Sequence, residues 1–171
     1  MAAPVSVRDA ADAPRYTISV PSSILIRDLR DDERAWANTQ YQSIQFAVTP
    51  PGAEALVAEL AGTRVGLGRL VVHRGETLEL GGIWTDEAVR GHGVARAMVT
   101  ALLDRLARGH HLGQVWCIPF AHLTAFYQSF GFTIAAPPWP PAITAKVAEC
   151  IEHALPEVAV LSLHSDARPS W

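Results

Sequence analysis

Segments with strand-like and helix-like patterns of apolar residues alternate along the chain. Strand patterns cover residues 23–29, 64–73, 77–85, 114–118, 132–135 and 158–163. Helical spacing of apolar residues predicts helices over residues 31–44, 94–108, 123–129 and 141–151. Residues 53–60 fit either a helix or a strand. An alternation of this kind predicts an α/β fold.

Two of these segments carry special features. Residues 94–108 form the clearest helix, because one face collects Ala95, Val99, Leu102, Leu103 and Leu106. The strand over residues 77–85 contains Gly81 and Gly82 side by side. Glycine weakens a strand, so the pair predicts a bulge or a close approach by a ligand or another backbone.

Composition and charge restrict the class of protein. The 171 residues, 49% of them hydrophobic, predict one ordered domain over residues 21–171 after a flexible arm over residues 1–20. The net charge is −3 and no basic stripe is visible, so no nucleic-acid partner is expected. No apolar run reaches the roughly 18 residues of a membrane span. Two cysteines indicate neither a disulfide framework nor a metal site, and a cytoplasmic protein is expected.

The stretch from Glu79 to Ala95 contains the candidate chemistry. It runs from a strand through a loop into Arg90-Gly91-His92-Gly93-Val94-Ala95 at a helix start. The first N–H groups of a helix lack intrahelical partners and, with the helix dipole, form an anion site. No Gly-Lys-Ser/Thr sequence follows, which excludes a P-loop. Arg96 stands where a dinucleotide fingerprint needs its third glycine.

These residues resemble the GNAT superfamily of N-acetyltransferases. Its central motif, Arg/Gln-x-x-Gly-x-Gly/Ala, is matched by Arg90, Gly93 and Ala95. The sequence AFYQSFGF at residues 125–132 is similar to a second family signature, and the two occur in the family's order. The resemblance covers roughly residues 23–163. It implies a mixed, strongly twisted central sheet with helices on both faces.

The resemblance also implies a function and a site. The expected activity is transfer of an acetyl group from acetyl-CoA directly to a primary amine. Tyr127 would protonate the leaving thiolate and Glu79 would act as general base, directly or through water. Pyrophosphate would bind at Arg90, Gly91, His92, Gly93, Val94 and Ala95, and pantetheine would pair with the strand at Ile83, Trp84 and Thr85. Acceptor pockets in the family correspond here to residues 31–51 and 137–156.

Alternative interpretations remain for the site residues and for the whole chain. Tyr127 could pack as a core aromatic residue beside Phe126, Phe130 and Phe132, and Glu79 could be a solvated strand carboxylate. The domain could bind or sense an acyl-CoA without catalysis, an idea motivated by Phe120, which stands where many relatives place Asn. It could also be an interaction domain that binds no CoA. A homodimer is possible.

The acceptor regions also suggest a substrate class. They contain Trp36, Tyr41, Phe46 and Trp139. We expect a partly apolar pocket for an aromatic or aliphatic amine, an amino acid or a peptide end.

Overall fold

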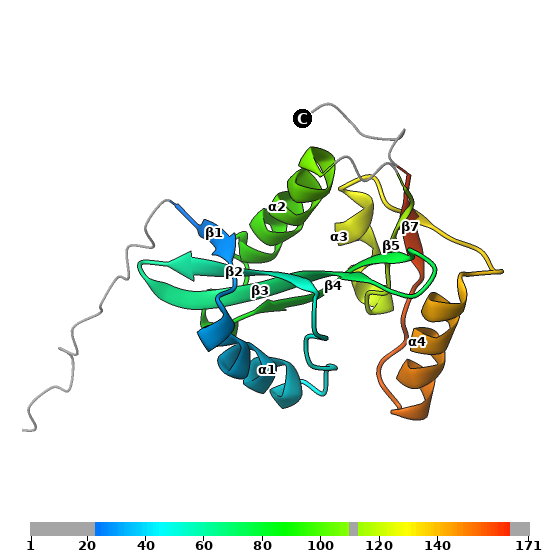
Figure 1. Ribbon diagram of the computed structural model, residues 1–171, viewed down its shortest axis with the longest axis horizontal. Helices are drawn as coiled ribbons and strands as arrows, with labels where there is room; N and C mark the ends of the chain where they lie inside the picture. Colours follow the sequence, from blue (N-terminus) through cyan, green and yellow to red (C-terminus); the bar gives the residue numbers. More distant parts are fainter. Residues whose placement is uncertain (1–22, 110–112, 165–171) are drawn as a thin grey trace, which may run out of the picture.

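A single seven-stranded sheet forms the centre of the molecule (Figure 1). The computed structural model describes residues 23–109 and 113–164, so the N-terminal arm predicted over residues 1–20 lies outside the described residues. The strand order is β1-β2-β3-β4-β5-β7-β6. Neighbouring strands are antiparallel except β4 and β5, which are parallel. The strands are β1 (Leu25–Asp28), β2 (Glu54–Leu60), β3 (Thr63–Val72), β4 (Leu78–Thr85), β5 (Val115–Cys117), β6 (Thr133–Ile134) and β7 (Leu161–Leu163).

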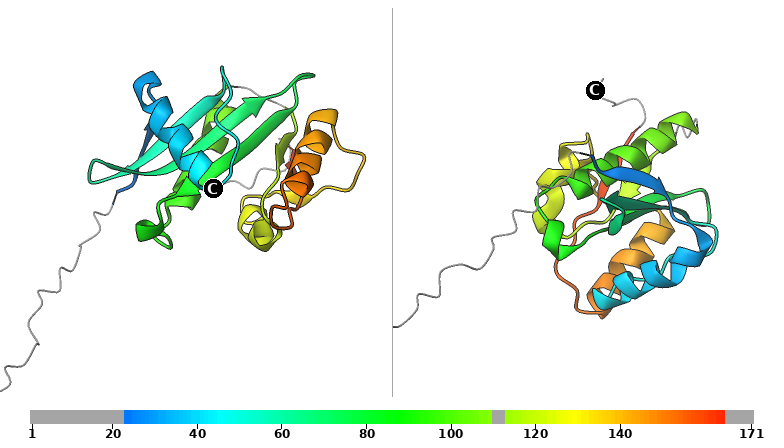
Figure 2. Two further views of the ribbon diagram at one scale, coloured as in Figure 1. Left: turned by 90° about the horizontal axis from the view of Figure 1, so that it is seen from below. Right: turned by 90° about the vertical axis from the view of Figure 1, so that its left-hand side faces the viewer.

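Helices cover both faces of this mixed sheet, as the sequence predicted (Figures 1 and 2). Helices α2 (Val94–Arg108) and α3 (Thr124–Gln128) pack on one face, and α1 (Arg34–Ser43) and α4 (Pro141–Glu152) pack on the other. Short 3-10 turns precede α1, α2 and α3, at Asp31–Glu33, Glu87–Val89 and Ala121–Leu123. Within the described part of the chain, no helix is both long and apolar enough to cross a membrane.

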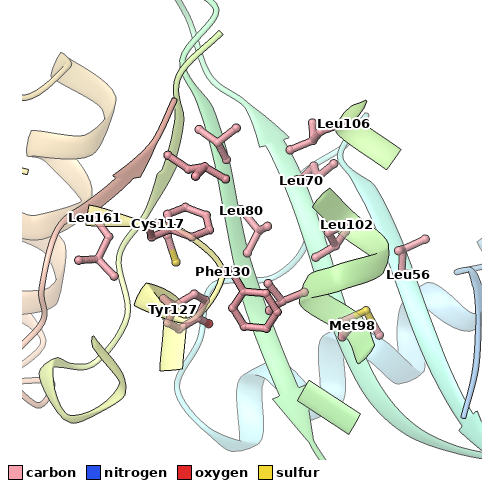
Figure 3. Close-up of a cluster of buried hydrophobic side chains, with 14 of the residues drawn as sticks. Leu56, Leu70, Leu80, Met98, Leu102, Leu106, Cys117, Tyr127, Phe130 and Leu161 are labelled. Atoms are coloured by element: carbon pink, nitrogen blue, oxygen red, sulfur yellow. The ribbon is translucent and has the colours of Figure 1, made fainter. Parts of the chain in front are cut away.

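The main hydrophobic core lies between α2 and the sheet (Figure 3). Met98 and Leu102 of α2 are completely buried there. A Cβ atom on Gly68 of β3 would lie 2.6 Å from Met98 Cγ, and one on Gly66 would lie 2.6 Å from Val94 Cγ1. The two glycines therefore permit the close packing of α2 on β3. A smaller core around Ala37 and Tyr41 fixes α1, and Ile143 anchors α4.

Several element boundaries differ from the sequence-based expectation. The ambiguous residues 53–60 form strand β2, because it pairs with β1 on one side and β3 on the other. The last strand is shorter than residues 158–163, since Val158 makes an isolated bridge to Phe120 instead of joining β6. The aromatic helix starts earlier, as a 3-10 turn at Ala121, and ends at Gln128.

Strands β4 and β5 separate soon after they meet. They pair at Leu78 with Val115 and at Glu79 with Trp116, whereas β4 continues to Thr85. Opposite the separation, Gly68 of β3 faces an extra residue of β4, because Leu67 pairs with Trp84 and Arg69 with Gly81. The two β4 residues opposite Gly68 are Gly82, whose φ is +60°, and Ile83. The glycine pair thus marks a β-bulge, as predicted, and a bulge increases the local twist of its strand.

Candidate functional site

A cleft of about 880 Å³ opens where β4 leaves β5. This volume is within the usual range for small-molecule sites. The predicted residues Glu79, Ile83, Trp84, Thr85, Arg90 and Tyr127 line it. Further lining comes from Gln42 at the end of α1, from residues 44–47 that follow it, and from Lys146, Glu149, Cys150, His153 and Leu155 of α4 and the loop after it. The structure therefore joins both predicted acceptor regions with the predicted catalytic residues in one cavity.

The loop before α2 has the shape of an anion site. Gly91 and Gly93 adopt left-handed φ values of +81° and +84°, and nothing lies within 4 Å of where their Cβ atoms would be. Gly93 is the N-cap of α2, so the N–H groups of the first turn lack intrahelical partners. Val94 is buried, and its side chain packs toward Gly66 of β3.

Two polar side chains accompany this loop. Arg90 is 62% exposed, lies 3.5 Å from Glu87 and lines the mouth of the cleft. His92 is exposed, and its Nδ1 lies 3.2 Å from the carbonyl oxygen of Val89 and 3.1 Å from that of Arg90. Because carbonyls only accept, His92 donates from Nδ1 to its own loop and keeps Nε2 free for solvent or a ligand.

The free edge of β4 borders the cleft. Beyond Glu79 the strand pairs with β3 alone among the described residues, and although the Gly82 carbonyl accepts from Tyr41, the edge from Ile83 to Thr85 is available to an extended ligand. The hydroxyl Oγ1 of Thr85 is buried without a hydrogen-bond partner. Trp84 also contacts α1, where its ring meets that of Trp36 edge-on at 6.0 Å.

Tyr127 approaches the same cleft from α3. Its ring packs edge-on against Phe126 and Phe132, so its packing role and a chemical role coexist. The side chain of Tyr127 lies next to that of Cys117 (Figure 3), close enough for each group to affect the pKa of the other. Burial, followed by the nearby Cys117, raises the pKa of Tyr127 well above its ordinary value, and burial also raises the pKa of Cys117. Both groups therefore carry their protons at neutral pH, and Cys117 acts as a buried apolar residue.

Glu79 is buried on the opposite face of the sheet, 7% exposed. Its Oε2 lies 2.6 Å from His73 Nε2, and its Oε1 lies 3.6 Å from Lys146 Nζ. Glu79 is therefore not a solvated strand carboxylate. The sequence analysis missed both partners. His73 becomes a neighbour of Glu79 through the register of the β3–β4 hairpin, and Lys146 arrives from α4, far along the chain.

The aromatic residues expected in the acceptor pocket divide between cleft and core. Phe46 lines the cleft and contacts Phe120 at a centroid distance of 5.9 Å. Trp36, Tyr41 and Trp139 pack in the smaller cores under α1 and α4 instead. Their large rings are buried against the sheet. Composition alone cannot distinguish an aromatic residue of the core from one that lines a pocket.

Comparisons with known proteins agree with this geometry. The sequence model of the family described as "Acetyltransferase (GNAT) family" matches residues 23–132. No curated protein sequence matches the chain. Many solved structures share the fold.

Three solved structures illustrate the similarity of fold. Rv2747 from Mycobacterium tuberculosis, in complex with CoA, is 22% identical with a TM-score of 0.60, over 82% of this chain and 98% of that one. The ribosomal-protein-S18-alanine N-acetyltransferase of Escherichia coli is 17% identical with a TM-score of 0.61, over 87% and 97%. N-acetylglutamate synthase from Neisseria gonorrhoeae, with CoA and L-arginine, is 12% identical with a TM-score of 0.62, over 82% and 33%.

The family match covers more than half of the chain, and each of the two motifs contributes one residue to the cleft, Arg90 from the first and Tyr127 from the second, while residues 91–95 lie outside its lining. Family and fold together support acyl-CoA-dependent acyltransferase activity. The chain belongs to the GNAT acetyltransferase family.

Proposed function

We propose that the protein transfers an acetyl group from acetyl-CoA directly to a primary amine. The observation that carries this proposal is the meeting of three features in one cleft. These are the free edge of β4, the protonated hydroxyl of Tyr127 and the buried carboxylate of Glu79. The part of the cleft along the free edge of β4 can hold an extended thioester, and the part toward α1 and α4 is left for an acceptor.

The residues present fit a CoA ester. Gly91 and Gly93 leave open space over the first turn of α2, where N–H groups and the helix dipole favour a pyrophosphate. Arg90 adds a positive charge at the mouth of the cleft. The free edge of β4 from Ile83 to Thr85 can pair with the amide groups of a pantetheine arm, and the orphaned Thr85 hydroxyl offers it a further partner. The thioester of bound acetyl-CoA would supply the acetyl group, its carbon–sulfur bond breaking as the carbon–nitrogen bond forms.

Glu79 is the group we assign as general base. An ammonium ion has no lone pair for attack, so a proton must first leave the acceptor nitrogen. A carboxylate oxygen of Glu79 can accept it, directly or through water, and His73 at 2.6 Å is placed to share it. Lys146 and His73 hold the carboxylate in one orientation at the wall of the cleft. A positioned base typically contributes about 10²–10⁴-fold to the rate.

Tyr127 is the group we assign beside the leaving sulfur. Its raised pKa keeps the proton on Oη. An ordinary thiol has a pKa of about 8.5, so complete proton transfer from such a phenol to a thiolate is uphill. The hydroxyl therefore acts first as a hydrogen-bond donor to the charge that develops on sulfur, and a proton delivered later from solvent completes the exchange.

Ligand binding is the first test. A thermal-shift series with acetyl-CoA, CoA, NAD and ATP should give stabilisation by acetyl-CoA and CoA alone. A ligand at 100 times its Kd adds about 2.7 kcal/mol of stability. No shift with acetyl-CoA or CoA would mean that the Arg90–Ala95 loop is an ordinary turn, and the proposal would be abandoned.

Turnover is the second test. Release of CoA thiol is followed with a panel of primary amines for the wild type, Tyr127→Phe and Glu79→Gln. Each variant should lose about 10²-fold or more in kcat while retaining CoA affinity. Glu152→Gln, an exposed change on the same α4 helix that carries Lys146, is the control. CoA binding without turnover of any amine by the wild type would favour the non-catalytic acyl-CoA-binding domain instead.

A further inference from the structure

Arg69 of β3 is a buried cation in an unusual setting. The residue is 5% exposed and lies on the floor of the cleft. Its Nη1 donates to Thr49 Oγ1 at 3.2 Å, and its guanidinium carbon lies 4.6 Å from the centroid of the Tyr41 ring. In the part of the chain that the structure describes, no carboxylate lies within ion-pair distance of this guanidinium.

The free donors of Arg69 open into the cleft. An arginine has five N–H donors, and Thr49 accepts from one nitrogen. Arg69 lines the cleft, so a group bound there is placed to accept from the remaining guanidinium nitrogens.

A structural role alone accounts poorly for this arginine. The Thr49 hydroxyl and the Tyr41 ring stabilise the guanidinium only in part, whereas burying a charge with no counter-charge in ion-pair distance is costly. The arrangement becomes favourable when an anion enters the cleft, because guanidinium–carboxylate hydrogen bonds are charge-assisted and matched in shape.

The glycine pair places this cation close to the proposed base. Arg69 pairs with Gly81 across the β3–β4 ladder, and Glu79 lies two residues before Gly81 on the same face. A Cβ atom on Gly81 would be 3.1 Å from Glu79 Oε1, and one on Gly82 would be 2.9 Å from Arg69 Nε. The two glycines thus form a floor on which the Glu79 carboxylate lies at one end and the Arg69 guanidinium at the other, and a side chain on either glycine would displace these groups.

We propose that Arg69 binds a carboxylate of the acceptor, so that the acceptor is an amine that also carries a carboxylate. This inference rests on the proposed function, because it assumes that the acceptor amine binds next to Glu79, the proposed general base. A compact amino acid fits such a floor, its nitrogen near Glu79 and its carboxylate on Arg69. A phosphate dianion fits less well, since Glu79 and Glu149 both face the cleft and repel additional negative charge.

The first experiment needs no variant. L-phenylalanine, L-leucine and β-alanine are compared with their carboxamides as acceptors by release of CoA thiol. We expect the carboxylates to have kcat/KM values roughly 10- to 150-fold higher, the factor that a charge-assisted hydrogen-bond pair usually gives. Equal values, or a preference for the carboxamides, would overturn the inference and leave acetyl transfer to amines intact.

Substitution then assigns the preference to one residue. Arg69→Gln should remove the preference for carboxylates while CoA affinity, measured by calorimetry, stays unchanged. Arg64→Gln is the matched control, because Arg64 lies on the same strand and also stacks on an aromatic ring, that of Trp36 at 4.3 Å, without lining the cleft. If circular dichroism shows Arg69→Gln to be unfolded, Arg69→Lys keeps the charge, loses the fork and should retain a reduced preference. A preference that survives in a folded Arg69→Gln variant would refute the assignment.

A binding measurement separates this inference from the proposed function. The N-acetyl derivatives of the same compounds are titrated into CoA-saturated protein. Tighter binding of N-acetyl carboxylates than of N-acetyl carboxamides, lost in Arg69→Gln, supports the carboxylate site even if no amine is acetylated, in which case the transferase proposal alone fails. Equal binding of the two series, with turnover present, refutes the carboxylate site and preserves the transferase.

Discussion

Gly82 should be among the glycines least tolerant of substitution. Its φ of +60° is left-handed, and a Cβ atom there would lie 2.9 Å from both Arg69 Nε and Tyr41 Oη. Neither side chain can move away freely. Tyr41 is 1% exposed and its hydroxyl donates to the Gly82 carbonyl at 2.8 Å, while Arg69 is held between Tyr41 and Thr49.

The cost of Gly82→Ala has two parts. A left-handed conformation costs a residue with a side chain about 1–2 kcal/mol. Forcing an extra methyl into a packed site costs typically 1–3 kcal/mol. The free energy of unfolding should therefore fall by about 2–5 kcal/mol, which for a domain of this size lowers Tm by roughly 4–20 °C. Since Arg69 must shift, acceptor binding should weaken as well, whereas CoA binding at the α2 loop should change little.

Gly75→Ala is the control that separates the two parts. Gly75 has a similar φ of +77° in the β3–β4 hairpin, but nothing lies within 4 Å of its would-be Cβ. Urea denaturation of both variants and the wild type gives the comparison. Gly75→Ala should lose about 1–2 kcal/mol, and the difference between the variants measures the clash. Equal losses would show that Arg69 and Tyr41 yield without cost, and the packing argument for this floor would be refuted.

Three further predictions follow from charge and burial. The Arg27 hydrogen bonds lower the pKa of Glu33 to about 2, so on acidification this carboxylate is protonated in the unfolded chain before it is protonated in the folded one. The free energy of unfolding should therefore fall as pH drops from about 4.5 toward 2. In denaturant titrations, Glu33→Gln should flatten that part of the curve of stability against pH. In native protein, Cys150 should react with a thiol reagent before Cys117, whose pKa is raised by complete burial; mass spectrometry of the labelled chain showing the reverse order would contradict the structure. Arg90→Gln should weaken CoA binding roughly two- to fivefold, with a smaller loss at high salt, because the side chain is exposed to solvent; an effect independent of salt would contradict a charge contact.

The sequence predicted the parts of the site that depend on local conformation. The helix over residues 94–108 and the glycines before it are readable because capping and phosphate binding are properties of a short contiguous segment. Tyr127 was selected as a candidate through its position in a second contiguous motif, and in the structure it lines the cleft. The bulge at Gly81 and Gly82 was predicted for the same reason, since two glycines inside a strand have few other uses.

The sequence did not reveal the cluster around Glu79, because its members meet through strand register and helix packing. A shift of one residue in the β3–β4 ladder would move Arg69 to the opposite face of the sheet, away from the cleft. Lys146, the sole lysine of the chain, reaches Glu79 because Ile143 anchors α4 against the sheet. Neither the register of the β3–β4 ladder nor the position of α4 on the sheet can be predicted from a short stretch of sequence.

The bulge at Gly82 is a local sequence feature that also affects which distant residues meet in the site. By adding a residue to β4 it increases the local twist next to the point where β4 leaves β5, which favours the separation that opens the cleft. Because of the bulge, a Cβ atom on Gly82 would point toward Arg69 and Tyr41, on the same face of the sheet as one on Gly81. One feature thus provides the free strand edge for the proposed donor and the close packing of Arg69 on Gly82 beside the proposed acceptor. A substitution at Gly82 should therefore affect acceptor selection together with stability, whereas one at Gly75 should affect stability alone.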